Sequence, residues 1–196
     1  MSDTVYLRGL PRSGTNFLEY LLRENFDIEL RKNSKHGIIP IPDQPDVRLC
    51  YITKHPIDWI QSLYAYGHSR TNVYISEYDW PKFVFKPIVM LTGSRGMWFR
   101  SPVDVWNGYL NHYRSWQCAV HIKLEELTPE TLEKLQVLWG LKRKGNLVWT
   151  KSSMNSNGKP TGQPFRARRR DGMWKREMIK FVEEIALLEE FGYGQA

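Results

Sequence analysis

The sequence predicts an α/β fold of three layers, in which helices flank a parallel β-sheet. Two observations favour this class. Short apolar and β-branched runs, which are typical of buried strands, alternate along the chain with segments whose apolar residues recur at helical spacing. No repeat or linker breaks this alternation, and 196 residues are enough to bury a sizeable core, so we expect one domain over residues 1–196.

Five strands are expected from the apolar runs. The first lies at 5–7, the second at 28–32, and the run VRLCYIT at 47–53 is the clearest central strand. Further runs at 118–124 and 146–149 complete the predicted sheet. Because helical segments separate these runs, the strands are expected to be parallel.

Five helices are expected where apolar residues recur every three or four positions. Ser101 before Pro102, and Thr128 before Pro129, are good pairs of N-cap and first helical residue. The expected helices begin at Thr15, Pro56, Pro102 and Pro129, and the last spans 174–191. Their core-facing residues are Phe17, Leu18, Leu21, Leu22, Trp59, Ile60, Leu63, Tyr64, Val103, Trp106, Leu110, Tyr113, Leu132, Leu135, Leu138, Met178, Val182, Ile185 and Leu188.

Two stretches show no periodicity. Aromatic residues, glycine and proline accumulate between 67 and 100, which indicates either an irregular cap over a site or an ordinary surface loop. The polar stretch 151–170 predicts a long functional loop.

The net charge of +7 indicates an anionic ligand, such as a nucleotide, a sulfated or phosphorylated substrate, a nucleic acid or a membrane surface. No apolar run approaches the roughly 20 residues of a membrane span, and the first residues do not read as a signal peptide. Cys50 and Cys118 each lie in an apolar run. We expect buried thiols rather than a disulfide, which favours a cytoplasmic location.

The turn GLPRSG nearly matches the P-loop pattern G-x-x-x-x-G-K-[ST] through Gly9 and Gly14. Thr15 stands where that pattern has Lys, and Asn16 stands where it has the hydroxyl that binds Mg²⁺. The positive charge lies instead in the turn, at Arg12. Because the N–H groups at a helix N-terminus bind anions, we expect this turn to hold a phosphate without a metal. An ordinary Gly/Pro turn is the alternative.

The segment LPRSGTN, residues 10–16, resembles the 5′-phosphosulfate loop P-[KR]-S-G-T-[TN] of the P-loop sulfotransferases. This family transfers a sulfonyl group from 3′-phosphoadenosine 5′-phosphosulfate to an acceptor. The resemblance implies that Arg12 bridges the 5′-phosphate and the sulfonyl group. The donor-binding residues that it implies here are Pro11, Arg12, Ser13, Gly14, Thr15, Asn16 and Phe17.

Two further segments resemble the 3′-phosphate site of this family. KHPID with Ser62 and Tyr64 is similar to R-[ND]-P-x-D-x-x-x-S-x-Y, which implies that Lys54 and Ser62 bind the 3′-phosphate. Residues 164–175 are similar to P-F-x-R-K-G-x-x-G-x-W-K, but the arginines are shifted in register. The candidates for binding the same phosphate are Arg166, Arg168, Arg169 and Arg170.

Two shorter matches follow the same order along the chain. WTKSSM at 149–154 resembles the T-S-F-x-x-M segment near the adenine, which implies nucleotide contacts for Thr150 and Ser152. SKHG at 34–37 resembles the K-x-H-x-P segment that carries the catalytic histidine of the cytosolic branch, which implies a catalytic role for His36.

The resemblance implies an enzyme that needs no metal and releases adenosine 3′,5′-bisphosphate. His36 is then the expected general base, because a neutral imidazole accepts a proton at physiological pH. A carboxylate on the first helix, Glu19 or Glu24, is the alternative base. Arg12 and the backbone N–H groups of 13–17 would stabilise the charge on the leaving phosphate.

The acceptor is a hydroxyl or amine compound that the sequence does not identify. The cap at 67–100 is expected on the acceptor side, where large apolar residues would line a pocket. These residues are Trp80, Phe83, Phe85 and Trp98.

Two other function classes compete with this interpretation. A small-molecule or nucleotide kinase would use the same kind of sheet, but the missing Lys and Ser/Thr of the P-loop count against it. A nucleic-acid-binding protein would explain the charge and the 13% aromatic residues. The basic residues concentrate at 166–175 rather than over a continuous surface, so we expect no nucleic-acid partner.

Overall fold

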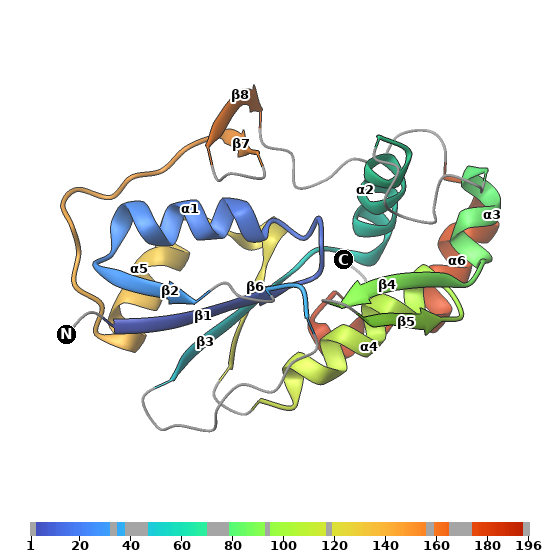
Figure 1. Ribbon diagram of the computed structural model, residues 1–196, viewed down its shortest axis with the longest axis horizontal. Helices are drawn as coiled ribbons and strands as arrows, with labels where there is room; N and C mark the ends of the chain where they lie inside the picture. Colours follow the sequence, from blue (N-terminus) through green and yellow to red (C-terminus); the bar gives the residue numbers. More distant parts are fainter. Residues whose placement is uncertain are drawn as a thin grey trace.

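Four parallel strands form the centre of the molecule, in the order β2-β1-β3-β6 (Figure 1). They are β1 (Asp3–Gly9), β2 (Ile28–Arg31), β3 (Arg48–Thr53) and β6 (Ala119–Lys123). The structure is a computed structural model that describes residues 3–31, 35–37, 47–69, 79–92, 95–116, 119–155, 159–164 and 174–193.

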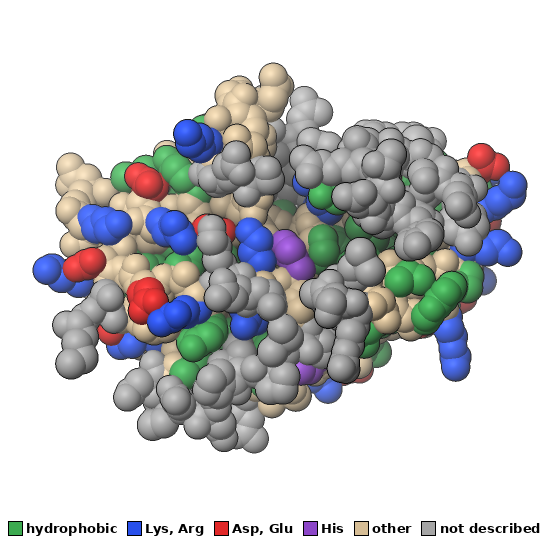
Figure 2. All heavy atoms as spheres, in the orientation of Figure 1, with side chains coloured by type: hydrophobic (Ala, Val, Ile, Leu, Met, Phe, Trp, Pro, Cys, Tyr) green, Lys and Arg blue, Asp and Glu red, His purple; other side chains and the backbone are tan. Residues whose placement is uncertain are grey.

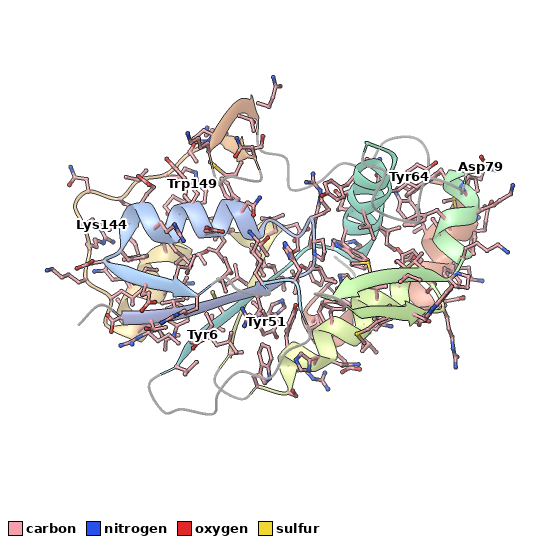
Figure 3. All side chains as sticks on the ribbon, viewed as in Figure 1. Tyr6, Tyr51, Tyr64, Asp79, Lys144 and Trp149 are labelled. Atoms are coloured by element: carbon pink, nitrogen blue, oxygen red, sulfur yellow. The ribbon has the colours of Figure 1, made fainter. Side chains whose placement is uncertain are left out.

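Helices cover both faces of the sheet, so the protein has the α/β fold that the sequence predicts. The helices are α1 (Thr15–Asn25), α2 (Pro56–Ser69), α3 (Trp80–Phe85), α4 (Pro102–Arg114), α5 (Pro129–Trp139) and α6 (Arg176–Ile185). On one face, Leu7, Cys50 and Ile122 share a core with α1 and α5. On the other face, Tyr51 shares a second core with α2, α4 and α6. Tyr6 and Tyr51 accordingly lie on the side of the sheet away from α1 (Figure 3).

The predicted helix starts are confirmed for α1, α2, α4 and α5. The Ser101 hydroxyl caps α4 by accepting a hydrogen bond from Asp104 N at 3.2 Å. Thr128 and Thr131 form a reciprocal capping box at the start of α5. These caps satisfy N–H groups that have no partner inside the helix, which is why local sequence is enough to locate the starts.

The predicted strand at 146–149 is wrong. The side chain of Asn25 takes the backbone hydrogen bonds that a strand would need, since Asn25 Nδ2 donates to Val148 O at 2.8 Å and Val148 N donates to Asn25 Oδ1 at 2.6 Å. The strands in this region are instead β7 (Ser152–Met154) and β8 (Pro160–Pro164), which pair as an antiparallel hairpin. Part of the loop expected at 151–170 is therefore regular.

The last helix is shorter than predicted, because α6 ends at Ile185 and a 3₁₀ turn follows at Glu189–Phe191. The side chain of Asn107 binds both sides of this end: Nδ2 donates to Ile185 O at 2.9 Å, and Oδ1 accepts from Leu187 N at 3.1 Å. The assignments of Leu138 and Ile185 to the core are also wrong, because their side chains are 64% and 37% exposed.

Regular elements occupy the described parts of the expected irregular cap at 67–100. α2 extends to Ser69, α3 follows at Trp80–Phe85, and β4 (Ile88–Thr92) pairs with β5 (Arg95–Phe99). Trp80 and Phe83 are buried against Tyr64, whereas Phe85 and Trp98 are exposed. Residues 70–78 lie outside the described part of the chain.

Cys50 is a buried free thiol, and burial raises its pKa to about 12. Cys118 lies outside the described residues. Among the helices that the structure describes, none is both long enough and apolar enough to cross a membrane.

Candidate functional site at the carboxyl ends of β1 and β3

The strand order places a switch point between β1 and β3. The chain leaves β1 through α1 on one face of the sheet, whereas it leaves β3 through α2 and packs α4 on the other face. In parallel sheets, ligands bind outside the carboxyl ends of the two strands where the helices diverge in this way. Gly9 pairs with Ile52 at these ends, so the turn 10–14 and Lys54 both follow at the same edge.

The turn 10–14 is held by its own hydrogen bonds. Ser13 N and Ser13 Oγ both donate to Leu10 O, at 3.1 and 2.7 Å. Arg12 and Gly14 adopt left-handed backbone conformations, with φ of 71° and 92°. A residue other than glycine pays roughly 1–2 kcal/mol for this conformation, and such strain concentrates at binding sites. The strained Arg12 therefore marks this turn as a candidate ligand loop.

The first turn of α1 presents N–H groups that have no backbone acceptor in the part of the chain that the structure describes. Within the described residues, the N–H groups of 14–16 make no backbone hydrogen bond. The N–H of Ser13 is used inside the turn, and the N–H of Phe17 donates to Gly14 O at 3.0 Å. Of the N–H groups at 13–17 that were expected to bind an anion, only those of 14–16 are therefore available. They lie at the positive end of the helix dipole.

Two aromatic residues of α2 contact the turn. Trp59 Nε1 donates to Pro11 O at 2.7 Å, and the ring of Tyr66 lies 5.0 Å from the guanidinium carbon of Arg12. The sequence indicates only a core position for Trp59, because its hydrogen bond depends on a residue 48 positions away. These contacts fix the turn after β1 against the helix that follows β3.

Lys54 and Ser62 meet at the start of α2. Lys54 Nζ donates to Ser62 Oγ at 2.7 Å, and Ser62 Oγ donates to Asp58 O at 2.8 Å. Trp106 Nε1 donates to Lys54 O at 2.9 Å and so holds the backbone of the lysine. Lys54 is only 4% exposed. Since burying an ammonium group costs free energy, a lysine held in this position is typical of a functional site.

His36 lies against the end of β1. Its Nδ1 is 2.8 Å from Gly9 O, and because a carbonyl oxygen only accepts, Nδ1 carries the hydrogen and Nε2 carries the lone pair. Burial lowers the pKa of His36 to about 4. The hydrogen bond to Gly9 raises this pKa, whereas the positive charge of Lys35 lowers it further. The imidazole is therefore neutral at pH 7, the form that accepts a proton.

The low pKa of His36 predicts that the protein loses stability as the pH falls from about 6.5 toward 4. Over this range the unfolded chain binds a proton that the folded protein does not, which costs about 1.4 kcal/mol per pH unit. Urea unfolding at pH 6.5 and 5.0 measures this loss. We expect His36→Gln to make the loss smaller by about 2 kcal/mol. The same pH slope in both proteins would contradict the buried, neutral state of His36.

Lys35 connects the segment of His36 to α1. Lys35 Nζ donates to Asn16 Oδ1 at 2.5 Å and to Glu19 Oε2 at 3.3 Å, and Glu19 also pairs with Arg23 at 3.4 Å. On the face shown in Figure 2, a histidine lies beside Lys or Arg side chains near the middle of the molecule, where Figure 1 places the start of α1. Glu24 is exposed in the last turn, about 13 Å along the axis from the start of the helix. Of the two alternative bases, only Glu19 is near this site.

The β7–β8 hairpin lies over α1 (Figure 1). Asn16 Nδ2 donates to Asn155 O at 2.9 Å, and Trp149 lies beside α1 (Figure 3). Thr150 Oγ1 accepts from Ser152 N at 3.0 Å, so these two predicted nucleotide contacts are neighbours at the start of the hairpin. The structure thus brings this segment to the first turn of α1.

The predicted arginines Arg166, Arg168, Arg169 and Arg170 lie outside the described residues. The described chain resumes at Trp174, whose Nε1 donates to Gln61 Oε1 at 3.0 Å. Gln61 precedes Ser62 on α2, so the chain just after these arginines is attached beside the pair formed by Lys54 and Ser62.

The fold and the residues at the carboxyl ends of β1 and β3 define an α/β protein with a candidate phosphate-binding loop. Comparison of the sequence with protein-family models gives no match, and comparison with curated proteins gives no significant match.

Proposed function

We propose that this protein is a sulfotransferase with a P-loop sulfotransferase-like fold. It would move a sulfonyl group from 3′-phosphoadenosine 5′-phosphosulfate to an acceptor hydroxyl or amine by in-line displacement. One observation carries this proposal: the turn 10–14 and the pair of Lys54 and Ser62 lie at adjoining strand ends, and the hydrogen bond from Trp59 to Pro11 joins them. A nucleotide with phosphate on both its 5′ and 3′ positions needs two such elements.

The residues at the end of β1 suit a 5′-phosphate. The N–H groups of 14–16 have no backbone acceptor among the described residues, and the exposed Arg12 adds a positive charge beside them. Lys35 adds a second cation next to the side chain of Asn16. Preorganised N–H groups and cations stabilise negative charge without further rearrangement.

The residues at the end of β3 suit the 3′-phosphate. Lys54 supplies a charge-assisted donor, and Ser62 is its hydrogen-bond partner. The Ser62 hydroxyl donates to Asp58 O in the present conformation, so it has to rotate to donate to a phosphate. Rotation about one side-chain bond is enough for this change.

The donor would supply the sulfonyl group and take up negative charge on its 5′-phosphate as the sulfur–oxygen bond breaks. Arg12 and the N–H groups of 14–16 would stabilise that charge. His36 Nε2 holds a lone pair and would accept the proton of the attacking hydroxyl. Phosphate charge close to His36 would raise its pKa from about 4 and strengthen the base.

Calorimetry with two nucleotides tests the proposal. Adenosine 3′,5′-bisphosphate is expected to bind at least about tenfold more tightly than AMP, because it adds a charge-assisted contact to Lys54. EDTA should leave both affinities unchanged. Equal affinities for the two nucleotides would refute the two-phosphate site, and a strict Mg²⁺ requirement would favour a kinase.

A further inference from the structure

Arg8 is a buried cation on the face of the sheet that α4 covers. It pairs in register with Tyr51 and is 4% exposed. Its Nη1 donates to Leu7 O at 3.1 Å, while its Nε is buried and has no hydrogen-bond partner among the described residues. Its electrostatic neighbours there are the side chains of Tyr113, Tyr6 and Cys50, none of which is a carboxylate. A buried cation that has no carboxylate partner among the described residues costs free energy, so its position indicates a ligand.

The phenol group of Tyr113 on α4 shares this environment, and the ring of Tyr109 packs beside it. In the described part of the chain, the hydroxyls of Tyr109 and Tyr113 are buried and have no hydrogen-bond partner. Their ring centroids are 6.1 Å apart, and the ring of Tyr113 lies 5.7 Å from that of Tyr51. Burial raises the pKa of Tyr113, and the nearby charge of Arg8 acts against this. The N–H of Gly9 is also close to Tyr113, but its hydrogen bond goes to Lys35 O at 3.0 Å.

From this arrangement we infer that Arg8 and Tyr113 form a subsite for a carboxylate group on the acceptor. With Nη1 bonded to Leu7 O, the Nε–Nη2 edge of the guanidinium is the one that can bind a carboxylate with two parallel hydrogen bonds. The phenol of Tyr113 brings the set to three donors, and a carboxylate offers about four lone-pair positions to accept them.

The subsite adjoins the strand end that holds the base assigned above. Gly9 follows Arg8 in the chain, and Gly9 O accepts the hydrogen bond of His36. A carboxylate at Arg8 would therefore orient an acceptor whose hydroxyl reaches His36, which makes hydroxycarboxylic acids the expected acceptor class. This acceptor assignment rests on the proposed sulfotransferase function, whereas carboxylate binding at Arg8 does not.

Titration with 4-hydroxybenzoate and its neutral analogue 4-hydroxybenzamide tests the subsite by calorimetry. The wild-type protein is expected to prefer the carboxylate by about tenfold or more. Arg8→Met should reduce this ratio to about one, and Tyr113→Phe should reduce it in part. Arg31→Met is the matched control, because Arg31 is an exposed arginine on the adjoining strand, and it should keep the wild-type ratio.

Stability separates a ligand role from a structural one. Since Arg8 has no carboxylate partner among the described residues, Arg8→Met should unfold at the same urea midpoint as wild type or at a higher one. A wild-type protein that does not prefer the carboxylate, or an Arg8→Met variant that keeps the preference, would overturn the subsite. A lower urea midpoint for Arg8→Met would assign Arg8 a structural role instead. Carboxylate preference in a protein that does not bind adenosine 3′,5′-bisphosphate would leave the subsite standing and refute the sulfotransferase.

Discussion

Replacing His36 by Gln is expected to lower turnover by about 10²–10⁴, the usual contribution of a general base. Affinity for adenosine 3′,5′-bisphosphate should stay near the wild-type value, because the imidazole acts on the acceptor's proton. The reason lies in its geometry: Nδ1 is committed to Gly9 O, and Nε2 holds the lone pair. Steady-state kinetics with a panel of hydroxyl acceptors, together with calorimetry of the nucleotide, measure the two quantities separately.

Three results complete the test of His36. An acceptor with an acidic hydroxyl, such as 4-nitrophenol, should partly rescue His36→Gln, because less proton removal is needed in the transition state. Arg12→Ala should differ from it by lowering both turnover and donor affinity. Glu24→Gln is the control, since Glu24 is exposed at the far end of α1. Full activity of His36→Gln with every acceptor would transfer the role of base to Glu19.

Replacing Lys54 by Met is expected to weaken binding of adenosine 3′,5′-bisphosphate by about 1.5–3 kcal/mol, the range for hydrogen bonds to charged groups. Met removes the charge and keeps much of the length of this buried side chain, so it leaves little cavity. Binding of AMP should hardly change, because AMP lacks the 3′-phosphate. Calorimetry of both nucleotides on wild type and variant gives the difference directly.

Two matched variants show whether the effect belongs to the site. Ser62→Ala removes the hydrogen-bond partner of Lys54 and should weaken the bisphosphate in the same direction by a smaller amount. Lys123→Met removes a lysine from the end of the neighbouring strand β6 and should leave both nucleotides unaffected. If Lys54→Met weakens AMP and the bisphosphate equally, Lys54 is a structural residue rather than a 3′-phosphate contact.

The candidate site could be located from sequence where its parts are local. The turn 10–14 joins β1 to α1, and Lys54 and Ser62 lie on either side of the start of α2, which follows β3. Short-range sequence patterns therefore predict both parts of the site. The charge state of His36 could not be found in this way. Its pKa of about 4 results from burial against β1, which brings together residues 27 positions apart. That Arg8 Nε has no hydrogen-bond partner among the described residues likewise depends on which side chains of α4 lie over the sheet.

The sequence by itself determined the α/β class, four of the five strands that it predicts for the parallel sheet, and the starts of α1, α2, α4 and α5, because apolar periodicity and capping residues act within a few positions. Only the tertiary structure decided where the chain stops being regular. Asn25 binds the backbone of Val148, 123 residues away, and prevents a strand there. Asn107 ends α6 from 78 residues away. A single buried amide can satisfy both an N–H and a C=O of a distant segment, and no local pattern records that pairing.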